Sequence, residues 1–173
     1  MTTPTWIKTT AAVAATAAIG FAATDPSTPW YRGLRKPSWQ PPPPAFPAVW
    51  TPLYALLAAA GTRALRRTTG KDRARFARTF GANLILNAGW PVLFFRARSP
   101  AAAFAEVVAL DLTNAMLLRH AAKADRLMVA ALTPYAAWTI FATALNAAIV
   151  VLNAGQGPVG HGLRRAGVHQ RRT

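Results

Sequence analysis

Long runs without a charged residue alternate with short clusters of arginine and lysine along this chain. The longest uncharged runs cover residues 9–24, 37–62, 79–95 and 127–163. A helix needs about 20 predominantly apolar residues to cross the hydrocarbon core of a bilayer, whereas a soluble helix carries charges along one face at every turn. The pattern therefore predicts membrane-spanning helices that are joined by basic loops.

We predict an all-α integral membrane protein, a bundle of five transmembrane helices with an ordered aromatic first loop, as one domain over residues 1–153. The basic segment 154–173 has no apolar periodicity, so we expect a disordered tail there. A soluble all-α core is the alternative interpretation of the same apolar runs. The expected helices cover about 5–24, 46–65, 76–95, 100–121 and 127–152.

The formal net charge of +15 would by itself fit a nucleic-acid-binding protein. A nucleic-acid-binding face, however, needs basic residues at helical spacing on one folded surface, and here they lie at the ends of apolar runs. We therefore expect no nucleic-acid partner, and we expect a lipid membrane as the surroundings of the bundle.

The basic residues also predict an orientation. Loops on the N-terminal side of the bundle carry eleven lysines and arginines (Lys8, seven within 63–78 and three within 119–126), against five in the other loops. Short basic loops stay in the cytoplasm, so we expect a multi-pass protein of a bacterial cell membrane with a cytoplasmic N-terminus. Residues 1–24 also fit a cleaved signal peptide, which would leave four spans.

The loop between the first two expected helices is rich in aromatic residues and proline. Aromatic side chains with a polar group favour the membrane–water interface. Prolines fix φ and lack an N–H, so we expect this loop to be ordered but neither helical nor extended in a sheet. A rigid aromatic loop at a bilayer surface predicts a lid over a ligand site. The expected lid residues are Trp30, Tyr31, Pro37 and Trp39.

Aromatic and amide residues recur at helical spacing in three of the expected helices. Amides are costly in hydrocarbon unless they are paired, so these faces should point into the bundle. A tryptophan on each of the three faces, with asparagines beside it, describes an aromatic cavity for a flat, largely apolar ligand. The expected ligand-binding residues are Trp50, Tyr54, Asn83, Asn87, Trp90, Phe94, Trp138, Ala142 and Asn146.

Simpler interpretations of the same residues stay open. The asparagines would serve equally well as hydrogen-bonding partners between helices. Tryptophans also anchor helices at the interface, which suits Trp6 and Trp39. Within the fourth helix, Glu106 and Asp111 are five positions apart and point about 140° away from each other, so they cannot form an acid/base pair. A structural partner for each, such as an arginine at a helix end, and a role in proton transfer both fit them.

Other kinds of chemistry find no support in the sequence. The chain has no cysteine, and its histidines lie at a helix end (His120) and in the tail (His161 and His169). We therefore expect no metal site, no axially ligated haem and no bound cofactor. No phosphate-binding loop, nucleophile elbow or zinc-ligand spacing is present, which excludes a conventional hydrolase or ATPase.

From Trp30 to Asn153 the chain resembles the TspO/MBR family, which comprises the tryptophan-rich sensory proteins and the translocator proteins (peripheral benzodiazepine receptors). The resemblance rests on spaced motifs that occur in the family's order. They are Trp30-Tyr31, Lys36-Pro37-Ser38-Trp39, Val49-Trp50, Leu53-Tyr54, Leu86-Asn87, Trp90-Pro91, Phe94-Phe95, Pro134-Tyr135, Trp138, Phe141-Ala142 and Leu145-Asn146.

The resemblance implies a five-helix bundle, commonly a homodimer, that binds porphyrins and isoquinoline-type ligands beneath the first loop. The family's ligand residues match Trp50, Asn87, Trp90, Trp138 and Ala142 of this chain. The resemblance also implies light- and oxygen-dependent breakdown of protoporphyrin, with Trp50 and Trp138 as the tentative catalytic residues. The small-residue pair Ala77-x-x-x-Gly81 is a weak pointer to dimerisation.

One feature departs from the family's animal members, which carry a cholesterol motif at the end of the fifth helix. The corresponding segment 145–153 contains no tyrosine and no basic residue, so sterol binding through that motif is not expected. We therefore predict a membrane receptor or sensor that binds porphyrins (tetrapyrroles) in a tryptophan-lined pocket. A light- and oxygen-dependent porphyrin-degrading enzyme and a small-molecule transporter are the alternatives.

Overall fold

The computed structural model describes residues 3–155, and this part of the chain is helical without strands, as predicted for an all-α protein. Five long helices make up the bundle, and a short helix and a π-helical segment, η1, lie between them. The elements are α1 (Thr5–Ala23), α2 (Pro29–Gly33), α3 (Ala45–Arg67), α4 (Gly70–Pro91), η1 (Val92–Arg96), α5 (Pro100–Ala124) and α6 (Arg126–Asn153).

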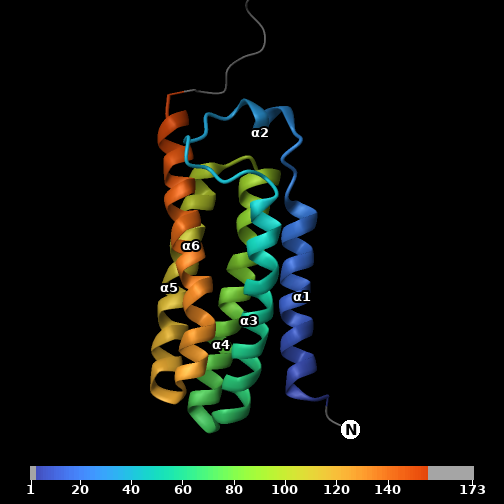
Figure 1. Cartoon of the computed structure of the whole chain (residues 1–173), viewed down its shortest axis with the longest axis vertical. Coiled ribbons are helices and arrows are strands. Elements are labelled where there is room, and N and C mark those ends of the chain that lie inside the picture. The colour runs from blue at the N-terminus through green and yellow to red at the C-terminus, as the bar shows by residue number, and fades with distance from the viewer. Residues whose placement is uncertain (1–2, 156–173) are drawn as a thin grey trace, which may run out of the picture.

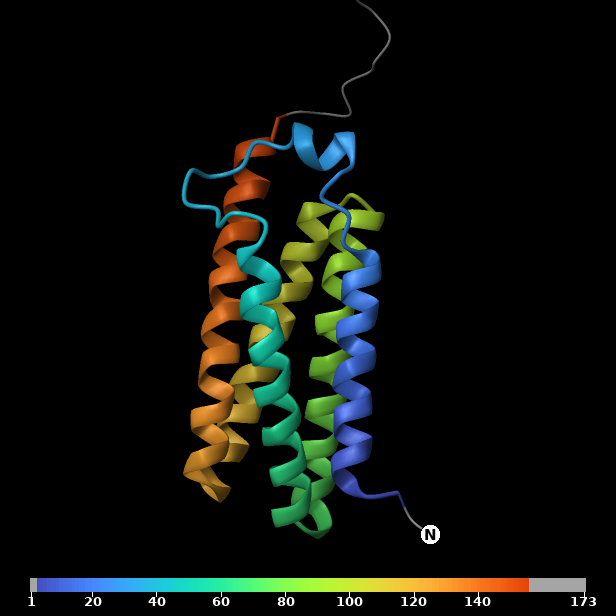
Figure 2. The same ribbon diagram turned by 45° about the vertical axis from the view of Figure 1, so that its right-hand side comes forward.

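The long helices run side by side along the long axis of the molecule and close into a ring (Figures 1 and 2). Helix α1 packs against α3 and α4, α3 packs against α6, and α5 packs against both α4 and α6. Helix α2 and the loop after it lie across one end of the ring, which we call the lid end. The other end carries the α3–α4 and α5–α6 turns, and we call it the hairpin end.

Four of the long helices in the described residues, α1, α3, α5 and α6, are long and apolar enough to cross a membrane. Helix α4 is different because its first turns, 70–78, carry five charged residues. It begins at Gly70, earlier than the expected residue 76, because a helix needs no apolar periodicity where it faces solvent. The five-span topology stays a prediction.

The end of α4 also differs from the expected regular helix. Pro91 has no N–H, and the following turns widen into η1, where Ala97 N donates to Val92 O at 2.9 Å, five residues back. Such π-helical turns often occur at functional sites and at kinks. Here the widened turns carry Phe94 and Phe95 to the lid end of the bundle.

The hairpin end is closely packed. Leu57, Phe76 and Met128 are at most 1% exposed, and they belong to one continuous cluster with Phe80. Gly61 of α3 makes this packing possible. A Cβ atom at position 61 would lie 2.6 Å from Cζ of Phe80, so the ring occupies the space that any other side chain would need.

Asp125 joins three helices at the hairpin end. Its carboxylate accepts a hydrogen bond from Leu127 N at 2.8 Å and so caps α6. It also pairs with Arg63 Nε at 2.6 Å and Arg67 Nη1 at 2.9 Å, both at the end of α3. The hydrogen bond from Arg63 lowers the pKa of Asp125 below its usual range.

The aromatic loop is ordered, but the prediction that it contains no helix was wrong, because α2 lies within it. Pro29 stands in the first turn of α2, where a missing N–H costs nothing, and Thr28 Oγ1 caps the helix by accepting from Tyr31 N at 3.2 Å. Lys36 Nζ then donates to the carbonyl oxygens of Tyr31 and Leu34 at 2.6 and 3.1 Å, which satisfies the last turn. The basic tail predicted from residue 154 lies almost wholly outside the described residues.

Candidate ligand-binding site

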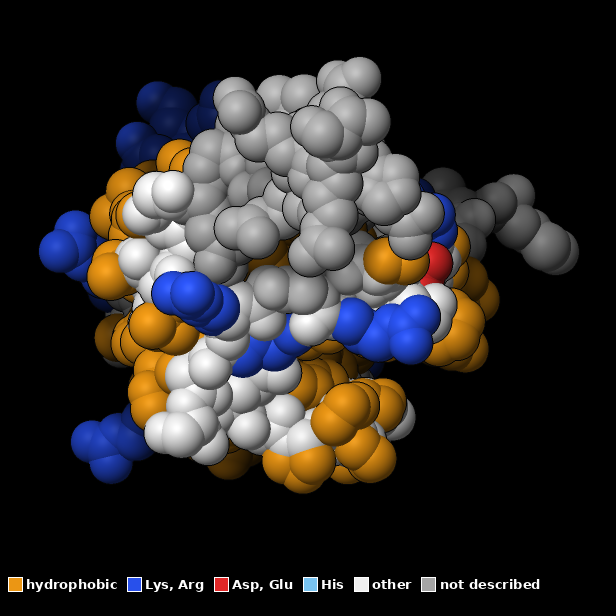
Figure 3. All heavy atoms as spheres, turned by 90° about the horizontal axis from the view of Figure 1, so that it is seen from above, with side chains coloured by type: hydrophobic (Ala, Val, Ile, Leu, Met, Phe, Trp, Pro, Cys, Tyr) orange, Lys and Arg blue, Asp and Glu red, His pale blue; other side chains and the backbone are white. Residues whose placement is uncertain are grey.

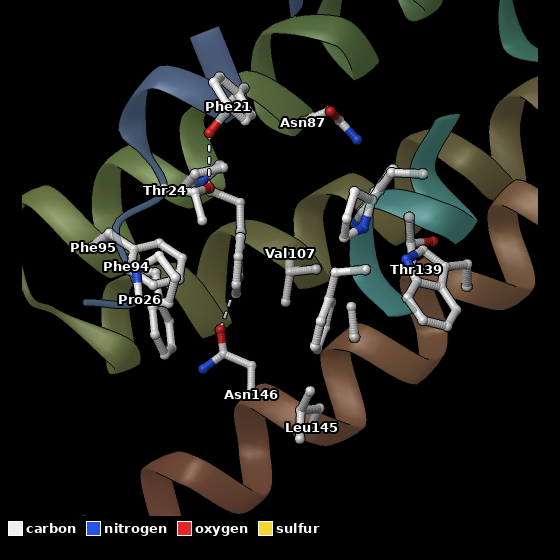
Figure 4. A pocket seen from close by; sticks show the side chains of 18 of the residues that line it. Phe21, Thr24, Pro26, Asn87, Phe94, Phe95, Val107, Thr139, Leu145 and Asn146 are labelled. Atoms are coloured by element: carbon white, nitrogen blue, oxygen red, sulfur yellow. Dashed lines mark hydrogen bonds between the residues drawn. The ribbon is translucent and has the colours of Figure 1, made fainter. Parts of the chain in front are cut away.

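A cavity of about 530 Å³ lies beneath the lid, inside the ring of long helices. Its volume falls within the range of small-molecule sites, roughly 300–1,000 Å³. Side chains from α1, α3, α4, α5, α6, η1 and the lid converge on it, as Figure 4 shows for Phe21, Val107 and Asn146. Its lining is mostly aromatic and aliphatic, and no charged side chain belongs to it among the described residues.

The structure brings most of the predicted ligand-binding residues together around this cavity. Asn83 is the exception, since it is fully buried and does not line the cavity. The predicted residues that line the cavity are Trp50, Tyr54, Asn87, Trp90, Phe94, Trp138, Ala142 and Asn146.

Trp50 and Trp138, the two tryptophans for which the family resemblance implies a catalytic role, meet edge to face. Their ring centroids are 6.5 Å apart with an interplanar angle of 87°. Trp50 stacks on Tyr54 and Trp138 stacks on Phe141, at centroid distances of 5.2 and 5.1 Å. Nε1 of Trp138 is buried and has no hydrogen-bond acceptor among the described residues. This wall therefore offers flat apolar faces to the cavity.

The third tryptophan of the cavity, Trp90, is already hydrogen-bonded. Its Nε1 donates to Asn146 Oδ1 at 2.9 Å, marked by the dashed line at Asn146 in Figure 4, and its ring stacks on Phe94 at 4.9 Å. Asn146 Nδ2 in turn donates to Pro100 O at 2.9 Å. The Asn146 amide thus joins α4, α5 and α6 and also presents an edge to the cavity.

A chain of buried hydrogen bonds forms the floor of the cavity. Tyr54 Oη donates to Asn87 Oδ1 at 2.8 Å, and Asn87 Nδ2 donates to Tyr135 Oη at 3.1 Å. Tyr135 Oη donates to Asn83 Oδ1 at 2.9 Å. Buried amides need such partners because an unpaired polar group in this interior is costly.

Asn83 continues this chain to α5 and α6. Its Nδ2 donates to Asn114 Oδ1 at 2.6 Å, and Asn114 Nδ2 donates to Thr139 Oγ1 at 2.8 Å. All the groups of Asn83 that form these bonds face neighbouring helices. The structure therefore favours the simpler interpretation of Asn83, as a hydrogen-bonding partner between helices, while Asn87 takes part in the chain and also lines the cavity.

Of the predicted lid residues, only Tyr31 lines the cavity. Trp30 supports it from outside, edge-on to Phe94 at 5.8 Å, and Trp39 is edge-on to Phe141 at 5.7 Å with half of its surface exposed. Pro37 does not reach the lining. The tryptophans of the lid thus hold the loop down rather than contact the cavity.

Sequence reasoning missed the contributions of α1, of α5 and of several loop residues. Gly20 and Phe21 of α1 line the cavity, as does Gln40, whose Oε1 is buried without a partner among the described residues. A Cβ at Gly20 would lie in ordinary van der Waals contact with Pro91 Cγ at 3.8 Å and Tyr54 Oη at 3.9 Å. The part of α1 that reaches the cavity holds no amide and no tryptophan, so it lacked the signal that marked the other helices.

The two acidic residues of α5 lie outside the cavity lining and apart from each other. Asp111 Oδ2 accepts from Thr143 Oγ1 of α6 at 2.7 Å. Both carboxylate oxygens of Glu106 are buried without a partner in the described residues, next to Gly89 of α4. In the described part of the chain neither acid pairs with an arginine, contrary to one expectation. Within residues 3–155 no cluster of three potential metal ligands occurs.

The fold and the site define an integral membrane protein with an uncharged, aromatic pocket at one end of a helical bundle. The model of the TspO/MBR family matches residues 9–152, and the chain belongs to this family. It is 36% identical over 155 residues to the tryptophan-rich protein TspO of Archaeoglobus fulgidus, which covers 86% of this chain and 98% of that protein. It is 33% identical over 124 residues to the tryptophan-rich sensory protein of Cereibacter sphaeroides, a match that covers 72% of this chain and 77% of that protein. It is 32% identical over 120 residues to the human translocator protein, a match that covers 68% of this chain and 70% of that protein.

Proposed function

We propose that this protein is a membrane sensor or receptor that binds a porphyrin or a related tetrapyrrole in the cavity beneath the lid. The observation that carries the proposal is the cavity itself, about 530 Å³ in volume, aromatic and without a charged lining residue. Such a site fits a flat, largely apolar ring. The names of the relatives, a sensory protein and a translocator protein, support the general class.

The site would bind mainly by aromatic contact. A ring between the Trp50–Trp138 wall and Trp90 would bury its apolar faces against these indoles. Ionised carboxylates of a porphyrin cannot lie among the uncharged lining residues without a large desolvation cost. We therefore place them at the lid end, beside the basic residues of the lid.

Removal of one tryptophan tests the proposal. Trp138→Ala should weaken protoporphyrin binding by about 1–3 kcal/mol, the range for the loss of one buried aromatic contact. The measurement is the quenching of tryptophan fluorescence by protoporphyrin in purified protein. Trp6→Ala is the matched control, because Trp6 is 57% exposed and lies outside the cavity lining. Equal affinity of the Trp50→Ala, Trp138→Ala and Trp6→Ala variants would contradict the site.

The close pair Trp50 and Trp138 favours a second candidate function, the light- and oxygen-dependent breakdown of bound porphyrin. The cavity lining offers no acid or base for ordinary catalysis, so the two indoles would have to act as electron donors to the photoexcited ring, with oxygen as the oxidant. Replacement of both by phenylalanine should keep much of the binding and slow product formation under illumination. Unchanged breakdown in that variant would leave binding as the function.

Three further proposals follow from the bundle. We place the hairpin end in the cytoplasm because most of the basic loop residues lie there. A homodimer through α4 is supported by Gly81, where a Cβ would meet nothing within 4 Å, so this small residue faces away from its own bundle. A transporter has less support, since neither Glu106 nor Asp111 lines the cavity.

A further inference from the structure

The cavity lining is exposed on one side only. The lining residues of α4, α5 and α6 are buried or partly buried, whereas the exposed ones come from the end of α1, the start of α3 and the loop segments beside them. Phe21 is the extreme case, since it lines the cavity and is 86% exposed. The exposed lining residues are Phe21, Thr24, Pro26, Pro43, Pro47 and Thr51. We call the gap between Phe21 and Thr51 the side opening.

Helices α1 and α3 are joined firmly at the hairpin end and not at the side opening. Thr9 and Thr62 hydrogen-bond to each other there, and Val13 belongs to the core cluster. Among the described residues this is the only hydrogen bond between side chains of α1 and α3. Nearer the lid, Gly20 of α1 lies opposite Tyr54 of α3, whose Oη is 3.9 Å from the position of a Cβ at residue 20. At the side opening no side-chain hydrogen bond within the described residues joins α1 to α3, and the end of α1 is held instead by Arg96 of η1, whose Nη2 donates to Ala22 O.

The lid itself is fastened to α6. Asn153 Oδ1 accepts from Arg35 N at 3.1 Å, and Asn153 Nδ2 donates to Arg35 O at 2.9 Å. This pair of bonds holds the lid backbone on both sides, and Trp30 and Trp39 pack against Phe94 and Phe141 beneath it. Entry from water through the lid would have to break all of these contacts at once.

With the start of α3, a helix long and apolar enough to span, placed at the membrane surface, the side opening reaches below the headgroup level. Thr51 is six residues into α3, which corresponds to about 9 Å along the helix, and the interfacial layer of a bilayer is only about 5–7 Å deep on each side. The side chains at the opening, Phe21 and Pro47, are apolar. Basic side chains surround the lid face above it, as Figure 3 shows from that side.

We infer that the ligand enters and leaves the cavity sideways from the bilayer, through the side opening between α1 and α3, and not through the lid. This rests on the proposed function, a flat ring bound in the cavity, and it narrows the ligand class. The ligand is an amphiphile whose ring dissolves in hydrocarbon while its ionised groups stay at the headgroup level, beside the basic residues of the lid. A fully water-soluble anionic ring does not meet these conditions.

Cross-linking across the side opening tests the inference. The chain has no native cysteine, so a Phe21→Cys/Thr51→Cys variant in phosphatidylcholine vesicles reacts with a short bifunctional maleimide at these two positions alone. Association and dissociation of protoporphyrin are followed by stopped-flow tryptophan quenching. We expect both rate constants to fall about tenfold or more with less than about a threefold change in Kd, because a closed path slows entry and exit equally. The unreacted double variant is the reference.

Two matched variants locate the path. Thr9→Cys/Thr62→Cys links the same two helices at the hairpin end, and Arg35→Cys/Asn153→Cys links the lid to α6; after cross-linking, both should keep the rates of their unreacted forms. Slowing by the lid cross-link, with unchanged rates in the Phe21→Cys/Thr51→Cys variant, would overturn the inference in favour of entry through the lid.

The remaining outcomes are also decisive. The monofunctional reagent N-ethylmaleimide on Phe21→Cys/Thr51→Cys should leave both rates close to the reference. Equal slowing by this reagent, or a loss of affinity without slower dissociation, would mean that added bulk fills the cavity, and would count against a path. Absence of quenching in the unsubstituted protein would overturn the proposed function and this inference with it. Normal binding by the unsubstituted protein, together with unchanged rates in the cross-linked Phe21→Cys/Thr51→Cys variant, would overturn the entry route alone.

Discussion

The same long helices build two ends of very different character. At the hairpin end, large side chains fit against small ones, as where Phe80 fills the space above Gly61, and Leu57 is fully buried. At the lid end the side chains are larger, yet they enclose a cavity of about 530 Å³. Edge-to-face pairs such as Trp50 with Trp138, in contact at 6.5 Å between ring centroids, form the wall of this cavity.

The comparison shows how a small bundle can bind a ligand without becoming unstable. Unfilled space forfeits dispersion contacts and destabilises a core, so a hollow end needs support from elsewhere. The hairpin end supplies close packing and the Asp125 ion pairs, and the hydrogen-bond chain through Asn87 and Tyr135 closes the cavity from below. Stability and binding should therefore respond to substitutions at different positions along the axis.

The largest expected effect is on the packed end. Phe80→Ala should lower the free energy of unfolding by about 3–5 kcal/mol, the range for a buried phenylalanine that leaves a cavity behind, with little effect on protoporphyrin affinity. Phe141→Ala is the matched substitution at the lid end, since Phe141 is only partly buried and lines the cavity. It should destabilise less and weaken binding more. Unfolding in mixed detergent micelles and fluorescence quenching measure the two quantities.

Equal losses of protoporphyrin affinity in Phe80→Ala and Phe141→Ala, measured under conditions in which both proteins are folded, would contradict this division between stability at the hairpin end and binding at the lid end. A stabilising detergent or lower temperature keeps the Phe80→Ala protein folded for this comparison. Gly61→Ala gives an independent check of the same contact, because its Cβ meets the Phe80 ring at 2.6 Å. It should be destabilising while removing no side chain.

Sequence patterns predicted the helical class, the ordered aromatic loop and most of the cavity lining, because each left a periodic or compositional signal. The stripe of Asn87, Trp90 and Phe94 lies where its spacing places it, on the inner face of α4 and η1. Helical spacing, however, identifies only the face on which a side chain lies. It could not separate Asn83, which faces other helices, from Asn87, which also meets the cavity.

Other features depended on tertiary context that no local pattern encodes. The residues of α1 that line the cavity are Ala17, Gly20 and Phe21, which form no stripe of polar or aromatic residues, so the part of α1 in the cavity was missed. Helix α2 was missed because proline suppresses helix in an interior position and supports it in a first turn. The partner of Asp111 turned out to be Thr143, since the α5–α6 contact brings the hydroxyl close.

An intermediate effect is expected at the boundary between the two ends. Asn83→Ala should lower stability by about 1–2 kcal/mol, in line with the loss of hydrogen bonds between membrane helices, while protoporphyrin affinity stays unchanged. Asn87→Ala removes bonds of the same chain and should lower both stability and affinity, because Asn87 also lines the cavity. Unfolding in mixed detergent micelles measures the stability of both variants, and fluorescence quenching measures their affinity for protoporphyrin. Equal losses of affinity in both variants would mean that the hydrogen-bond chain, rather than contact with the ligand, controls binding.

The smallest expected effect concerns pH and the hairpin end. Because Arg63 lowers the pKa of the folded Asp125 carboxyl, the ionised carboxylate stabilises the fold above its usual pKa of about 3.9, and this contribution is lost as pH falls through the lower folded value. Arg63 and Arg67 are partly exposed, so solvent and salt weaken the pairs. Asp125→Asn keeps a good capping residue for α6 and removes the ion pairs.

The stability difference between Asp125→Asn and the unsubstituted protein should therefore be present at pH 7, shrink with added salt, and vanish in acid below the folded pKa. Affinity at the lid end, compared between the two proteins at each pH, should not differ, since the cavity lining is distant from this turn and uncharged. Unfolding titrations at several pH values provide the measurement. A difference that persists unchanged in acid would show that Asp125 acts through the geometry of its cap and not through its charge. A difference in affinity would show that the hairpin end transmits its state along the bundle to the cavity.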